Sequence, residues 1–208
     1  MYGNIGVDDV ATIDGYVARL PKNGVVVNLG CGPNTCRQLH NLAATLARLQ
    51  WESTLILADS VTGPIKNVLW IPGPRHVHVV TLNAATATEV LGPEQADLVL
   101  AFGLFGDLSA STTPQGGGKI AWAAVLTQCF RLLRPQGHLI VSNSCDRQPF
   151  DEFTDAVKDA GFAVRHHHES ASYWSQSEQE RRYLIVCGGF DVEALPNGRL
   201  HPTPQPRS

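Results

Sequence analysis

The sequence predicts an α/β protein built on a doubly wound, mostly parallel seven-stranded sheet with helices on both faces. Short, strongly apolar runs alternate with longer segments of helical periodicity, as in parallel sheets that are buried on both faces. The length of 208 residues suits one compact α/β unit, and no internal repeat is present. We therefore expect one domain over residues 1–194, followed by a loose, proline-rich tail over 195–208.

The first half of the chain predicts a helix followed by strands that alternate with helices. Val10, Ile13, Val17 and Leu20 recur at three- and four-residue steps, which predicts a helix over 7–20 that ends before Pro21. The elements expected after it are a strand over 24–29, a helix over 35–49, a strand over 54–58, a short helix from Pro64 and a strand over 76–80.

The second half continues the same alternation. A strand over 97–102 is followed by a helix over 119–133, and Arg134-Pro135-Gln136-Gly137 predicts a turn. The remaining expected elements are a strand over 138–142, a helix over 150–160, a strand over 162–167 and a strand over 182–187. Asp97 begins a strand at the edge away from the expected ligand side, so we expect its role to be structural.

Composition excludes several classes of protein. The 16 Lys and Arg residues against 19 Asp and Glu residues give a net charge of −3, without the basic stripe that favours nucleic-acid binding. The five cysteines form no C-x-x-C pair, so neither a disulfide framework nor a zinc ribbon is indicated. No apolar run is long enough for a membrane span, and the first residues lack a secretory signal. We therefore expect a cytoplasmic protein with reduced thiols.

The most informative segment is 25–34, where an apolar strand runs into a glycine-containing turn that opens a helix. Gly30 and Gly32 can adopt positive φ and let a ligand approach the backbone, while the N–H groups at the helix start favour an anionic group. A dinucleotide-binding turn needs a third glycine where Thr35 stands, so nicotinamide or flavin binding is disfavoured. The segment indicates a nucleotide-like ligand.

The run Asn28-Leu29-Gly30-Cys31-Gly32-Pro33-Asn34 resembles the first motif of class I S-adenosylmethionine-dependent methyltransferases. The resemblance extends in order over 24–188, because 96–100 resembles the fourth-strand motif and 130–141 the segment before the fifth strand. It implies S-adenosylmethionine as cofactor and in-line methyl transfer to a small organic acceptor. The cofactor-binding residues that it implies are Asn28, Gly30, Cys31, Gly32, Asn34, Asp59, Ser60, Asn83, Ala84 and Phe102.

Within that set, the resemblance assigns the methionine part to Gly30, Gly32 and the backbone beside them, the ribose hydroxyls to Asp59, and the adenine to Asn83. Asn28 stands where the family usually carries an acid, and an amide cannot pair charge with the methionine ammonium. Asn34 stands where the family usually has a third glycine, and asparagine tolerates left-handed backbone better than other non-glycine residues.

The acceptor side carries weaker signals. We expect the acceptor pocket over 102–107 and 143–146, at the carboxyl ends of two strands. Asp107, Asp146 and His168 are candidates for a general base, and none stands out. We expect no metal site, because only two of the three histidines 166–168 can share one face of a strand. The small, polar loop 108–118 is either a lid or a surface loop.

Alternatives from other classes stay open. A non-catalytic binding or partner subunit of the same fold is motivated by Asn28 and Asn34. A structured-RNA methyltransferase would need basic side chains that cluster only in three dimensions. An aminopropyltransferase would need an acidic polyamine pocket that we do not identify. The sequence predicts no oligomeric state.

Overall fold

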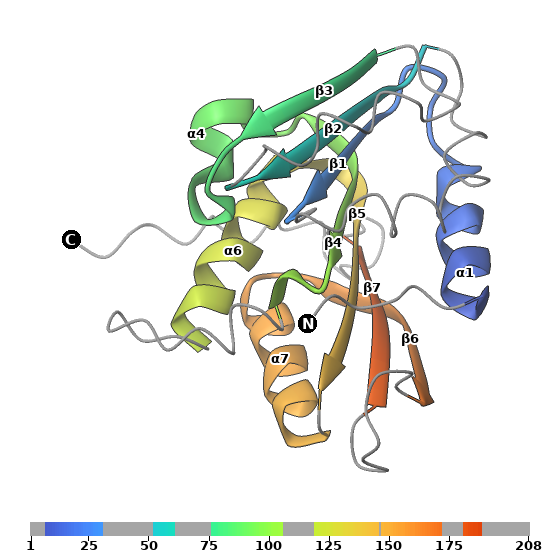
Figure 1. Cartoon of the computed structure of the whole chain (residues 1–208), viewed down its shortest axis with the longest axis vertical. Helices are drawn as coiled ribbons and strands as arrows, with labels where there is room; N and C mark the ends of the chain where they lie inside the picture. The colour runs from blue at the N-terminus through green and yellow to red at the C-terminus, as the bar shows by residue number, and fades with distance from the viewer. Residues whose placement is uncertain are drawn as a thin grey trace, which may run out of the picture.

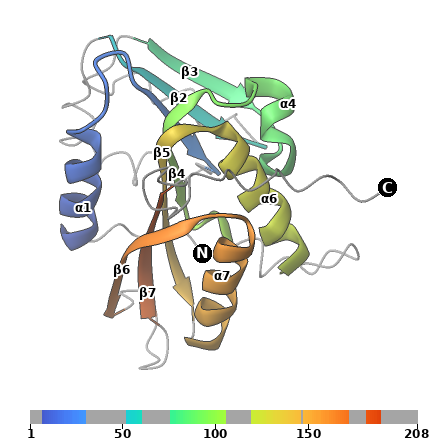
Figure 2. The same ribbon diagram turned by 180° about the vertical axis from the view of Figure 1, so that it is seen from behind.

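The computed structural model describes residues 7–30, 52–60, 76–105, 119–145, 147–171 and 181–188. These residues form one 7-stranded sheet in the order β3-β2-β1-β4-β5-β7-β6 (Figures 1 and 2). The strands are β1 (Val25–Leu29), β2 (Thr54–Asp59), β3 (His76–Thr81), β4 (Ala96–Phe102), β5 (Leu133–Cys145), β6 (Ala163–Ala171) and β7 (Arg181–Gly188). β7 pairs antiparallel with β5 and β6, and the other pairs are parallel. This confirms the mostly parallel sheet.

Helices cover both faces of the sheet. The described helices are α1 (Val7–Val17), the short 3-10 helix η2 (Ala84–Thr86), α4 (Ala87–Leu91), α6 (Lys119–Leu132) and α7 (Arg147–Asp159). α1 lies on one face, and α4, α6 and α7 lie on the other (Figures 1 and 2). Val26 joins the buried cluster of Ile13 and Val17 from α1, whereas the next residue, Val27, joins the cluster of the opposite face. Alternate residues of one strand thus fill two separate cores.

Several boundaries differ from the sequence prediction. α1 ends at Val17, three residues before the predicted end. A turn follows it, closed by the Leu20 N–H, which donates to the Val17 carbonyl at 3.1 Å, and this turn leads into Pro21. α7 begins at Arg147, before the predicted residue 150, and η2 and α4 were not predicted. The expected helices at 35–49 and Pro64, the loop 108–118 and the tail 195–208 lie outside the described residues. None of the helices that the structure describes is long and apolar enough to cross a membrane.

The predicted turn before the fifth strand is a bulge inside β5. Leu133 pairs with Ala96, and pairing resumes between His138 and Leu98, so the residues between Leu133 and His138 have no regular partners in β4. Gln136 adopts φ of 69° there, a left-handed conformation. The predicted start of the strand at residue 138 was therefore wrong, because the chain already joins the sheet at Leu133.

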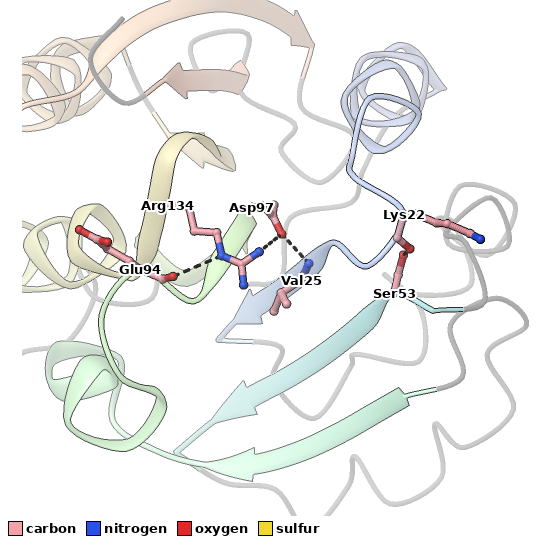
Figure 3. Close-up of polar contacts among 6 residues, drawn as sticks. All are labelled: Lys22, Val25, Ser53, Glu94, Asp97 and Arg134. Atoms are coloured by element: carbon pink, nitrogen blue, oxygen red, sulfur yellow. Dashed lines mark hydrogen bonds and ion pairs between the residues drawn. The ribbon is translucent and has the colours of Figure 1, made fainter. Parts of the chain in front are cut away.

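Asp97 ties the beginnings of three strands together (Figure 3). Its Oδ2 accepts hydrogen bonds from Val25 N–H at 2.8 Å and from Arg134 Nη1 at 2.9 Å. Arg134 Nε also donates to the Glu94 carbonyl at 3.3 Å. The Asp97 side chain is only 15% exposed, so its carboxylate is largely shielded from water, whereas the Arg134 side chain is 38% exposed. The structural role predicted for Asp97 is confirmed.

Two cysteine thiols lie in the core. Cys129 of α6 and Cys187 of β7 are free and buried. Burial raises the pKa of the Cys129 thiol to about 12, with a smaller contribution from nearby Cys187, and burial likewise raises the pKa of Cys187 to about 12. Both thiols are therefore neutral near physiological pH.

Replacing Asp97 by Ala should lower the free energy of unfolding by about 2–3 kcal/mol, because the Val25 N–H and the Arg134 guanidinium lose a charged acceptor. Asp97→Asn should lose less, since its amide oxygen still accepts one hydrogen bond. Urea unfolding measures the difference. The control is Asp155→Ala, which removes an exposed ion pair with Lys158 and should change stability little. Equal losses for Asp97→Ala and Asp155→Ala would contradict the role of Asp97.

Cys129 and Cys187 should resist iodoacetamide in the folded protein at about pH 8 and react fully in urea, as followed by peptide mass spectrometry. Because their folded-state pKa is raised from the ordinary value of 9.0 to about 12, burial of the neutral thiols stabilises the fold below pH 9.0. That contribution should be lost as the pH rises toward 12. Rapid native-state labelling of either thiol would refute this assignment.

Candidate functional site

The strand order places a ligand site at the carboxyl ends of the central strands. β1 has β2 on one side and β4 on the other, so the chain reverses its direction of winding at β1. Ligands of open α/β sheets bind in the crevice outside the strand ends at such a switch point. The described residues of the predicted cofactor set all lie at or just after the carboxyl ends of β1, β2, β3 and β4; they are Asn28, Gly30, Asp59, Ser60, Asn83, Ala84 and Phe102.

Asn28 is a buried polar residue near the end of β1. Its side chain is 1% exposed, and it alternates with Val27, so it points to the face that α1 covers. Neither Nδ2 nor Oδ1 has a hydrogen-bond partner within the described part of the chain. A buried amide without partners costs about 1–3 kcal/mol per polar group, so a ligand that supplied partners would offset that cost.

Gly30 directly follows β1 in a conformation that favours glycine. Its φ is +67°, and its N–H donates to the Ala58 carbonyl of β2 at 2.8 Å. A Cβ atom at this position would lie 2.7 Å from Cδ1 of Leu104. Both the dihedral angle and the contact disfavour a side chain here, and the bare backbone allows a ligand to approach closely.

Polar groups follow the neighbouring strands β2 and β3. Asp59 is half-buried at the end of β2, where Ser60 Oγ donates to its Oδ1 at 3.3 Å and Leu82 N–H donates to its carbonyl at 2.9 Å. Asn83 Oδ1 accepts from Ala85 N–H at 2.9 Å and thereby caps η2. This bond leaves the Nδ2 group and a second lone pair of Oδ1 for other partners. The amide predicted to contact adenine thus also starts a helix.

The turn after β4 contacts both Gly30 and β5. Gly103 has φ of 74° and its N–H donates to the Ser142 carbonyl at 2.8 Å. Trp122 Nε1 donates to the Phe105 carbonyl at 3.0 Å, and the Phe105 ring lies 4.8 Å from the Phe153 ring. These contacts hold the turn that places Leu104 against Gly30.

Sequence reasoning missed Ser142. It is fully buried in β5 opposite Phe102, the last residue of β4, and its Oγ has no partner among the residues described. By strand alternation it shares the α1-covered face with Ile140. The available signal was a small polar residue that ends the apolar run 139–141 at the carboxyl end of a strand.

Other predicted site residues are not brought together by the described structure. Cys31, Gly32 and Asn34 from the cofactor set, and the base candidates Asp107 and Asp146, lie outside the described residues. His168 lies in β6, where its backbone pairs with Leu184 of β7. The described part of the site therefore consists of backbone, amide, carboxylate and hydroxyl groups.

No protein-family model matches the sequence, and no curated protein matches it significantly. Solved structures are similar in fold. N-methyltransferase NodS from Bradyrhizobium japonicum WM9, in complex with S-adenosylhomocysteine, superposes with a TM-score of 0.61 at 11% identity, covering 91% of this chain and 89% of NodS. The 1,6-didemethyltoxoflavin-N1-methyltransferase of Burkholderia thailandensis, with S-adenosylhomocysteine bound, gives 0.60 at 16% identity, covering 88% and 76%.

The [4+2]-cyclase SpnF is equally similar, with a TM-score of 0.60 at 12% identity, covering 87% of this chain and 81% of the cyclase. These likenesses show that the chain has the class I methyltransferase fold, as the sequence predicted. They show the fold alone, because a cyclase and methyltransferases share it.

Gly30→Ala should destabilise the protein through two effects. The positive φ of 67° strains an alanine by about 1–2 kcal/mol, and the added Cβ clashes with Leu104. Gly92 provides a contrast, because it also has a positive φ, of 82°, but a Cβ there meets no atom closer than 3.7 Å. In thermal unfolding, Leu104→Ala should recover part of the stability lost in Gly30→Ala but none of that lost in Gly92→Ala. A Leu104→Ala change that recovers nothing in Gly30→Ala would rule out the clash.

Proposed function

We propose that this chain is an S-adenosylmethionine-dependent methyltransferase that acts on a small organic acceptor. The observation that carries the proposal is the end of β1, where the buried amide of Asn28, which has no hydrogen-bond partner among the described residues, lies two residues before Gly30, whose positive φ and close contact with Leu104 disfavour a side chain. This pair lies at the switch point of a class I methyltransferase fold, beside the carboxylate of Asp59.

The residues present fit the cofactor. The Asn28 amide and the backbone at Gly30 would contact the methionine part, the Asp59 carboxylate would accept hydrogen bonds from the ribose hydroxyls, and Asn83 would bind adenine. Further proposed contacts are Cys31, Gly32, Asn34, Ser60, Ala84 and Phe102. The bound cofactor supplies an electrophilic methyl group on a sulfonium centre.

The chain's own residues would align the acceptor and exclude water. Methyl transfer is an in-line displacement, so positioning and a dry site contribute most. Phe102 and Phe105 are buried, and the turn between them is held by β5 and α6. An acceptor with an O–H group would need a base, for which Asp107, Asp146 and His168 remain the proposed candidates.

The acceptor class is supported by two of the similar proteins, which carry the names of N-methyltransferases, one of them with the small molecule 1,6-didemethyltoxoflavin bound. A second candidate function is a binding protein of the same fold that does not transfer methyl. Asn28 favours it, because an amide carries no charge to pair with the methionine ammonium. Both the methyltransferase and the binding protein would bind the cofactor, but only the methyltransferase would transfer its methyl group.

Calorimetric titration with S-adenosylmethionine and S-adenosylhomocysteine tests the proposal, with NAD as a negative ligand. The wild-type protein should bind both sulfur ligands, and Asp59→Ala should weaken binding at least about tenfold, because charge-assisted hydrogen bonds to the ribose are lost. Asn28→Leu should also weaken binding, yet leave the free protein as stable as wild type or more so, since it removes a buried amide that has no partner among the described residues.

Asp155→Ala, on the exposed side of α7, is the control and should leave affinity unchanged. No binding of either sulfur ligand would refute the proposal. Binding that neither Asp59→Ala nor Asn28→Leu affects would place the ligand elsewhere. Where both ligands bind, release of S-adenosylhomocysteine from S-adenosylmethionine in an acceptor screen separates the methyltransferase from the binding protein.

A further inference from the structure

Gln128 connects α6 to the first turn of α4, and the two helices pack against each other (Figures 1 and 2). Its Oε1 accepts hydrogen bonds from Thr88 N–H at 3.0 Å and from Thr88 Oγ1 at 2.5 Å. The N–H groups in the first turn of a helix have no partner within that helix. Thr86 is the N-cap residue of α4, yet its side chain makes no cap hydrogen bond. Gln128 therefore supplies from α6 the cap that α4 lacks locally.

α6 is a firm support for this cap. Leu126 and Cys129, on either side of the Gln128 position, are fully buried in the core cluster of that face. Ala87, the first residue of α4, is fully buried in the same cluster. Of the described residues outside η2 and α4, Gln128 is the one whose side chain hydrogen-bonds to either helix. In the described structure, the position of α4 thus depends on apolar packing and on Gln128.

The segment that Gln128 holds begins at Asn83. η2 runs directly into α4, because Thr86 is the last residue of η2 and the N-cap of α4. Thr86 N–H donates to the Asn83 carbonyl at 3.0 Å. On the other side of Asn83, Leu82 N–H donates to the Asp59 carbonyl at 2.9 Å. Asn83 is therefore held between β2 and α4, and a shift of α4 would move its amide.

The cap of η2 also fixes which way round the Asn83 amide lies. Asn83 Oδ1 accepts from Ala85 N–H at 2.9 Å, and the Nδ2 group cannot replace it because it only donates. The fixed amide can still offer Nδ2 and a second lone pair of Oδ1 to a ligand, and the Asn83 side chain is exposed. Turning the amide over would break the cap of η2.

We propose that Gln128 is a positioning residue that makes the site selective for adenine, an inference that rests on the proposed function and its assignment of adenine to Asn83. An asparagine amide recognises adenine by accepting from the amino group and donating to a ring nitrogen. Hypoxanthine has a carbonyl oxygen in place of that amino group, so it would need the amide turned over. Without the hydrogen bonds to Gln128, η2 and the amide would be less constrained, and selectivity would fall together with affinity.

Calorimetric titration with S-adenosylhomocysteine and S-inosylhomocysteine, which carries hypoxanthine, tests the selectivity. The wild-type protein should bind the adenine ligand at least about tenfold more tightly. Gln128→Met, which keeps the length but removes the acceptor, should reduce this preference at least about threefold, chiefly by weakening the adenine ligand. Gln128→Glu retains acceptor oxygens and should keep the preference. The matched control, Thr127→Ala, removes a bond to the Ala123 carbonyl within α6 and should also keep it.

Hydrogen exchange in the ligand-free protein tests the cap separately. The amides of residues 84–91 should exchange at least about fivefold faster in Gln128→Met than in the wild type, because the first turn of α4 loses its cap. Gln128→Glu and Thr127→Ala should exchange as the wild type does. Thr88→Val, which removes the hydroxyl partner of Gln128, is the second variant should circular dichroism show that Gln128→Met misfolds.

The outcomes separate this proposal from the proposed function. Gln128→Met that weakens both ligands equally would overturn the role in selectivity and leave the proposed function standing. So would a preference that Asn83→Ala loses and Gln128→Met keeps. Unchanged exchange over 84–91 in Gln128→Met would overturn the cap. A wild-type protein that binds neither ligand would refute the proposed function, and the role of Gln128 with it, even where the exchange result matches.

Discussion

The carboxylate of Asp97 sets the register on which the site depends. It accepts hydrogen bonds from the first N–H of β1 and from the Arg134 side chain in the bulge of β5. These bonds connect β1, β4 and β5 at the ends where the strands begin. Parallel strands rise about 3.3 Å per residue, so fixing their starts also fixes where they end. Asn28, Gly30 and Phe102 reach the same edge because β1 and β4 are aligned at the other end. Asp97, at the opposite end of the strands, thereby helps to position the residues that would bind the cofactor.

The shape of the candidate site depends on a close contact between Gly30 and Leu104. Leu104 fills the space that a side chain at position 30 would need, and the turn that carries Leu104 is held by the Ser142 carbonyl and the Trp122 indole. The consequence is a bare stretch of backbone beside a buried amide. Such a surface is costly in isolation and becomes favourable only with a ligand that supplies hydrogen bonds.

The sequence predicted most strands well because they are apolar runs bounded by turn residues, as in β1 between Gly24 and Gly30. The largely polar β6 was predicted to end at residue 167 and continues to Ala171. It predicted β5 poorly at its start, because Arg134-Pro135-Gln136-Gly137 has the local chemistry of a turn and only the pairing of Leu133 with Ala96 makes it a bulge. α4 was missed although Asn83 and Gly92 flank η2 and α4 as cap residues. Ser142 was missed because its burial depends on strands that are distant in sequence. The roles proposed for Asn28, Asp59 and Asn83 rest on the resemblance to class I methyltransferases, because the residues around each of them do not by themselves indicate a ligand.

The position of β7 affects how the nascent chain can fold. β7 is the last of the described strands along the sequence, yet it lies between β5 and β6 and is the one partner of β6 in the described sheet. While residues 181–188 are still within the ribosome, β5 has an unpaired edge and β6 has nothing to pair with. The carboxyl-terminal half of the sheet therefore completes only after synthesis of its last strand, whereas β1 to β4 can assemble earlier. An incomplete chain would expose the backbone of β5 to chaperones or to other nascent chains.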